Sequence, residues 1–109
     1  MRNYQASELI QRTLSTVLHT ETLDPRLSKV TITGVDLSPD FKQATIFFTQ
    51  MNDSKKAILT TEKVFKKALG YFRAQLSEKT GLRYTPQLSF QFDRSQQNAE
   101  RIAKLLSKN

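Results

Sequence analysis

The chain has 109 residues, with 17 Lys and Arg against 10 Asp and Glu, which gives a formal net charge of +7 and a sequence pI near 9.9. This length allows one small core, so we expect residues 1–109 to form a single domain. The absence of Cys and the presence of one His exclude disulfide frameworks, thiolate metal sites and multi-His zinc sites. These counts rule out most hydrolytic chemistry, and we expect no metal, no cofactor and no enzyme activity.

The positive charge is concentrated in the second half of the chain. Residues 1–54 carry five basic and six acidic side chains, whereas residues 55–109 carry twelve basic and four acidic ones. Such a one-sided excess indicates a face that binds a polyanion, although a solvated lysine-rich helix is the alternative interpretation. No apolar run is long enough to span a bilayer, and the first residues do not resemble a signal peptide, so the sequence predicts a cytoplasmic protein.

The first half of the chain predicts a helix followed by two strands. Apolar residues recur at helical spacing from Tyr4 to Thr20. The segment from Lys29 to Leu37 alternates as a strand does, but its pattern slips by one residue around Gly34, which predicts a bulge there. A turn over residues 38–40 then leads into a second alternating segment, Phe41 to Thr49, and we expect an antiparallel hairpin.

The second half predicts helices around one more strand. Helix formers run from Lys55 to Lys79, further than a compact domain of this size extends, so we expect a bend, and Gly70 is the obvious place for it. Gly81 is placed to end the second helix. A third strand, Gln87 to Asp93, and a last helix that begins at Asp93 or Ser95 complete the order.

The lysines of the first central helix fall on one side of it. At 100° per residue they share an arc of about 120°, and we call this group of five the lysine face: Lys55, Lys56, Lys63, Lys66 and Lys67. The opposite arc is apolar, so the sheet is expected to cover it and leave the lysines exposed. A phosphate backbone suits such a strip because each neutralised phosphate releases counterions. A membrane surface would also suit it, but the apolar arc is needed by the sheet.

The residues that could be considered for catalysis fit structural roles instead. His19 lies near a helix end, where a lone His is usually a surface residue, and Asp24, Asp36 and Asp40 fit turns or caps. Catalytic motifs, phosphate-binding glycine loops and metal-ligand spacings are lacking. Among the aromatic residues, Phe47 and Tyr84 are the candidates for stacking on bases.

The order of elements is that of an α+β fold, a type II KH-like domain with an αββααβ core, a three-stranded sheet with helices on one face, and a C-terminal helix. The interhelical GxxG of KH domains is replaced here by Ala68-Leu69-Gly70. This AxG corner resembles the ribosome-binding factor A family. The matching segments are Asp24-Pro25-Arg26-Leu27, residues 30–35 with 37–40, and residues 82–90 with 93–95.

The resemblance implies an assembly factor that binds the small (30S) ribosomal subunit through its 16S rRNA and assists late maturation of that RNA, especially in the cold. It also implies a monomer, and a GTPase is a possible partner that promotes release. The expected RNA-binding residues are the lysine face and five others: Lys55, Lys56, Lys63, Lys66, Lys67, Ala68, Gly70, Arg73, Lys79 and Arg83. The alternative is a general KH-like protein for single-stranded RNA or DNA outside the ribosome.

Overall fold

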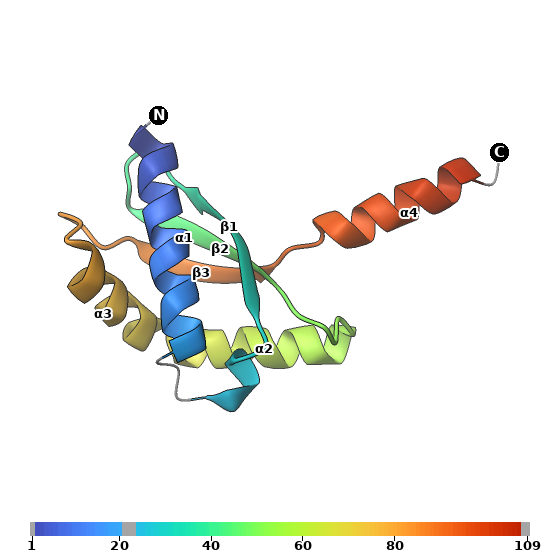
Figure 1. The fold of residues 1–109 in the computed structure, drawn as a ribbon, viewed down its shortest axis with the longest axis horizontal. Coiled ribbons are helices and arrows are strands. Elements are labelled where there is room, and N and C mark those ends of the chain that lie inside the picture. Colours follow the sequence, from blue (N-terminus) through green and yellow to red (C-terminus); the bar gives the residue numbers. More distant parts are fainter. Residues whose placement is uncertain (1, 21–23, 108–109) are drawn as a thin grey trace.

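A computed structural model describes residues 2–20 and 24–107, without the side chains of residues 2–4 and 96–97 (Figure 1). The predicted order of elements is confirmed. In chain order they are α1 (Arg2–Thr20), the 3-10 helix η1 (Pro25–Leu27), β1 (Thr31–Leu37), β2 (Gln43–Thr49), α2 (Lys55–Lys67), α3 (Leu69–Thr80), β3 (Gln87–Phe92) and α4 (Ser95–Ser107). In the described parts of the chain, no helix is both long and apolar enough to cross a membrane.

The three strands form one sheet in the order β1-β2-β3. β1 and β2 make the predicted antiparallel hairpin, whereas β3 runs parallel to β2 after the crossover through α2 and α3. The predicted bulge is present, because the register steps from Ile32 opposite Phe48 to Gly34 opposite Phe47. Thr33 is therefore the extra residue, and the step returns Leu37 to the buried side.

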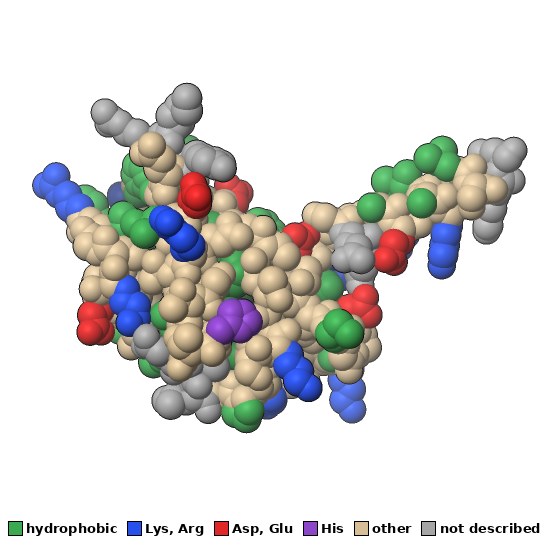
Figure 2. Space-filling view, viewed as in Figure 1, with side chains coloured by type: hydrophobic (Ala, Val, Ile, Leu, Met, Phe, Trp, Pro, Cys, Tyr) green, Lys and Arg blue, Asp and Glu red, His purple; other side chains and the backbone are tan. Residues whose placement is uncertain are grey.

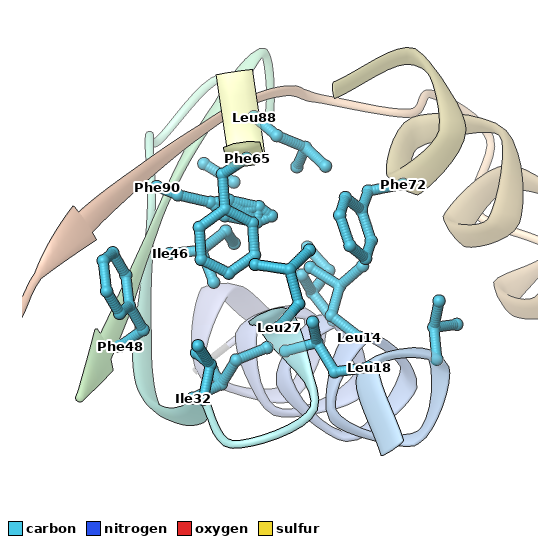
Figure 3. Packing of buried hydrophobic residues seen from close by; sticks show 14 of the residues in the cluster. Leu14, Leu18, Leu27, Ile32, Ile46, Phe48, Phe65, Phe72, Leu88 and Phe90 are labelled. Atoms are coloured by element: carbon cyan, nitrogen blue, oxygen red, sulfur yellow. The ribbon is translucent and has the colours of Figure 1, made fainter. Parts of the chain in front are cut away.

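Helices cover one face of the sheet, as the sequence predicts. Residues of β2 and β3 alternate between the core and the surface, with Ile46 and Phe90 buried and Ser89 and Gln91 exposed. The predicted stripe of α1 lies against the buried face through Leu14, and η1 adds Leu27 (Figure 3).

Five phenylalanine rings join the central helices to the strands. Phe65 of α2 stacks on Phe90 of β3, with ring centroids 4.0 Å apart and an interplanar angle of 3°. The same ring lies 5.1 Å from that of Phe48 and 5.8 Å from that of Phe72, and Phe92 packs edge-on against Phe48. All five are buried, so the apolar arc of α2 faces the sheet as expected.

The prediction that the helix pair bends at Gly70 is wrong. The break is at Ala68, which has φ −99° and ψ 8° and ends α2 with its N–H shared between the Val64 and Phe65 carbonyls. These angles are open to any residue, so the break needs no glycine. Gly70 is the second residue of α3 and is exposed, and a Cβ added to it would have nothing within 4 Å.

The helix α4 projects away from the rest of the molecule (Figure 1). All its described side chains are exposed, including the apolar Ile102, Leu105 and Leu106. The radius of gyration is 15.2 Å, whereas a compact domain of this length would have about 13 Å. The molecule is therefore more extended than its length predicts, because its last helix forms an arm that the sheet does not cover.

Replacing Gly70 by Ala should raise the free energy of unfolding by about 0.4–1 kcal/mol, because Ala favours a helix and a Cβ meets open space here. The matched control is Gly81→Ala, which should lower it by about 1 kcal/mol because Gly81 has φ +65° as the residue that ends α3. Urea unfolding of both variants measures the difference. A loss of stability in Gly70→Ala would contradict the assignment.

Candidate nucleic-acid interface

The lysine face is exposed on α2. Ser54 caps the helix by accepting a hydrogen bond from the Ala57 N–H at 3.2 Å, and the buried Phe65 fixes the rotation of the helix about its axis. All five lysines are exposed, and none pairs with a carboxylate among the residues that the structure describes. Figure 2 shows basic side chains along the lower edge of the molecule, where Figure 1 places α2.

The face has two sides of different character. At 100° per residue, Lys56, Lys63 and Lys67 lie within about 40° of one another. Lys55 and Lys66 lie on the side of Glu62, whose Oε2 accepts a long hydrogen bond of 3.4 Å from the N–H of Phe92. The first three lysines are therefore farther from this carboxylate and form the more positive side.

The corner residues behave differently from each other. Ala68 is half-buried and packs against the core, whereas Gly70 is exposed on α3. The two helices do not need a small residue at position 70 in order to meet, since a Cβ added to Gly70 would have nothing within 4 Å. Open space around Gly70 leaves room for a ligand there.

Arg73 links α3 to the segment that precedes β3. Its Nε donates to the Pro86 carbonyl at 3.0 Å and its Nη2 donates to the Thr85 carbonyl at 2.9 Å, so the guanidinium fastens α3 to the segment that enters β3. These two bonds limit how far the guanidinium of this expected RNA-binding residue can turn toward a ligand. Its role in RNA binding stays a prediction.

Lys79 and Arg83 lie toward the far end of α3. Both are exposed, and the Arg83 guanidinium carbon lies 5.5 Å from the centre of the Tyr84 ring. Tyr84 is 68% exposed, so one stacking candidate is accessible. The other candidate, Phe47, is half-buried on the face of the sheet that the helices do not cover.

Two basic residues beside α2, Arg26 and Lys29, were not among the interface residues predicted from the sequence. Arg26 in η1 lines a hollow at the start of α2, together with Lys29 and Lys56, and also a second hollow near its end, together with Lys67. The contact between η1 and α2 places them there. Their only signal in the sequence was two positive charges close together, in a half of the chain whose net charge is near zero.

Asp24 and Asp93 make hydrogen bonds that stabilise local structure. Asp24 caps η1 and pairs with Arg26 at 2.8 Å, and the hydrogen bond from that side chain lowers the pKa of Asp24. Hydrogen bonds from Ser95 and Thr33 lower the pKa of Asp93. Among the described residues, no three His, Cys, Asp or Glu side chains group as metal ligands. These contacts give the acids structural roles.

The fold and the exposed basic face define a small KH-like α+β domain suited to binding nucleic acid. The sequence profile described as ribosome-binding factor A matches residues 2–106. The chain belongs to the ribosome-binding factor A family. Curated relatives of that name include one from Coxiella burnetii, 39% identical over 98% of this chain and 88% of its own length, and one from Ruthia magnifica, 44% identical over 94% of this chain and 88% of its own.

Solved structures confirm the fold. The crystal structure of ribosome-binding factor A from Thermus thermophilus superposes with a TM-score of 0.72 at 22% identity, covering 85% of this chain and 98% of that one. A second comparison is with a homology model of the Thermus thermophilus protein fitted into an electron-microscopy map of a 30S complex. Its TM-score is 0.65 at 23% identity, covering 81% of this chain and 91% of that one.

Replacing Arg73 by Lys should lower the free energy of unfolding by about 1–2 kcal/mol, because one ammonium cannot reproduce two directed bonds to neighbouring carbonyls. The control is Lys67→Gln on the exposed lysine face, expected to stay within about 0.5 kcal/mol of the original protein. Chemical denaturation measures both. Equal stabilities for the two variants would show that Arg73 does not fasten α3 to the β3 entry.

Proposed function

We propose that this protein is a non-enzymatic assembly factor that binds the small ribosomal subunit through 16S rRNA. It assists late maturation of that RNA, especially in the cold. The observation that carries the proposal is the lysine face, whose five exposed cations are held on one side of α2 by burial of the other side. The proposal includes action as a cytoplasmic monomer, with a GTPase promoting release.

Family membership supplies the target. The Thermus thermophilus relative is described in a complex with 30S, and the relatives carry the name of a factor that binds ribosomes. The lysine face gives this target a physical basis, since rRNA offers closely spaced phosphates. The lysines bind these phosphates, and the open space at Gly70 lets the RNA backbone pass the corner between α2 and α3.

The remaining predicted contacts extend this surface at lower density. Lys79 adds positive charge in the last turn of α3 and Arg83 adds it just beyond that helix, and Ala68 contributes by being small at the corner. Arg73 contributes with the part of its guanidinium that the Thr85 and Pro86 carbonyls do not engage.

Sedimentation tests the proposed function. The protein should co-sediment with free small subunits at low salt and be absent from assembled ribosomes, and the binding should weaken steeply as salt rises. Sedimentation with assembled ribosomes alone would overturn the assembly role. Equal affinity for an unstructured RNA oligonucleotide and for the subunit would favour the general single-strand binder instead.

Replacing Lys63, Lys66 and Lys67 together by Glu should abolish co-sedimentation with small subunits while the thermal unfolding midpoint changes little, because all three are exposed. If each contacts one phosphate, replacing them by Gln should flatten the slope of log affinity against log salt by about 2.

The matched control moves the same charge elsewhere. Arg12, Lys42 and Arg101 are exposed on α1, the turn before β2 and α4, so their triple replacement by Glu changes the net charge equally. This control should retain most of the binding. Equal losses in both triple variants would show that net charge, and not the lysine face, determines affinity.

Replacing Gly70 by Glu tests the corner. The side chain enters open space, so the protein should fold, but bulk and negative charge should weaken subunit binding by about tenfold or more. Gly70→Ala is the control and should bind normally. If Gly70→Glu binds as well as the original protein in the sedimentation assay, the RNA does not pass this corner.

A further inference from the structure

A hollow of about 530 Å³ lies at the start of α2, between that helix, the turn after η1 and the segment that leaves β2. Three basic residues line it: Arg26 of η1, Lys29 of the following turn, and Lys56 of α2. They come from segments up to 30 positions apart in the sequence, so tertiary structure alone brings them together. Only Lys56 belongs to the lysine face.

The charge in this hollow is positive even after its ion pair is counted. Asp24 binds Arg26 through two bonds, Nε to Oδ1 at 3.1 Å and Nη2 to Oδ2 at 2.8 Å. This pair orients the guanidinium and leaves Nη1 outside the contact, and the Arg26 side chain is still 62% exposed. Lys29 and Lys56 are exposed as well. An anion here would meet three cations against one carboxylate.

Gln50 provides a hydrogen-bond acceptor in the wall of the hollow. Its Nε2 donates to the Asn52 carbonyl at 2.8 Å, which fixes the orientation of the amide, and its Oε1 is buried with no donor among the residues that the structure describes. A buried carbonyl without a partner is costly, and a ligand that brings a donor removes that cost.

Apolar atoms complete the lining. Met51 is 93% exposed at the hollow, and Val30 and Ala57 form part of its wall. A long exposed thioether is well suited to pack on a flat ring because it is flexible and polarisable. The hollow thus combines cations, an acceptor and an apolar surface.

We propose that this hollow binds one unpaired nucleotide of the RNA strand that lies along α2. Its phosphate contacts Lys29, Lys56 and the free edge of Arg26, its base packs on Met51, and a base or ribose donor reaches Gln50. The proposal rests on the proposed function and extends the path of the RNA beyond the lysine face. Lys56 to Lys67 spans about 16 Å of helix, so one strand can contact both ends.

A nucleotide fits this combination better than a simpler ligand does. A bare phosphate would use the cations but neither Met51 nor Gln50, and an apolar ligand would leave the cations without a partner. Phosphate contacts hold a strand in place, while stacking and contacts to base edges are typical of recognition of unpaired RNA.

The test uses the full chain and three probes: a single-stranded RNA of six adenosines, adenosine monophosphate, and inorganic phosphate. NMR titration should shift the Gln50 side-chain amide and the Met51 methyl signals when the RNA is added. Inorganic phosphate should not shift the Met51 methyl. Equal affinity for the free mononucleotide and the RNA would overturn the assignment to an RNA strand.

Replacing Arg26 and Lys29 together by Gln, neither of which belongs to the lysine face, should weaken binding of this RNA by about tenfold at low salt and flatten the salt slope by about 0.7, the loss of one phosphate contact. The control, Lys42→Gln with Lys104→Gln, removes the same charge from exposed sites outside the hollow and should change affinity by less than about twofold.

The result separates this inference from the proposed function. If the RNA binds and shifts signals of the lysine face while the Gln50 and Met51 signals do not shift and the Arg26/Lys29 variant binds normally, the hollow is not a nucleotide site and the proposed function stands. If the original protein binds neither this RNA nor the small subunit, the proposed function and the inference both fail.

Discussion

The stacking of Phe65 on Phe90 is the contact on which the rest of the structure depends. It joins α2 to β3, and the neighbouring Phe48 and Phe72 extend the same cluster to β2 and α3. Side chains of a helix are fixed relative to one another at 100° per residue, so burial of the Phe65 ring also determines where the lysines point. The core and the basic surface are thus two consequences of one rotational setting of α2. A core substitution that turned α2 would move the charge without changing its amount.

The parallel pairing of β2 with β3 imposes the next constraint. Parallel neighbours need a crossover, and α2 and α3 together form it here. The break at Ala68 lets this crossover turn back along the sheet, and Arg73 then fastens α3 to the chain entering β3. The corner, the basic helix and the β3 entry are therefore parts of one connection. Any ligand that lies along α2 therefore contacts the connection that links β2 to β3.

Local pattern predicts most of the fold and only part of the candidate interface. The stripe of α1, the slip before Val35 and the positive-φ position at Gly81 each follow from spacing or backbone preference, and all are confirmed. The break at Ala68 could not be found this way, because glycine marks where a chain can bend and packing decides where it does. Arg26 lies outside any periodic segment, and Lys29 is only the first residue of one, ahead of the observed start of β1 at Thr31. Their nearness to α2 results from η1 packing beside that helix, which no sequence spacing encodes.

The arm formed by α4 limits how much of the chain unfolds as one cooperative unit. An isolated helix of 13 residues is marginal in water, and α4 exposes its apolar side chains instead of adding them to the core. Its opening therefore costs a small part of the free energy of global unfolding, and the cooperative unit of the protein ends near Phe92. The helix can fray and reform while the sheet, the aromatic cluster and the lysine face remain intact. The helix α4 thus forms a separate unit of low stability beyond the aromatic cluster.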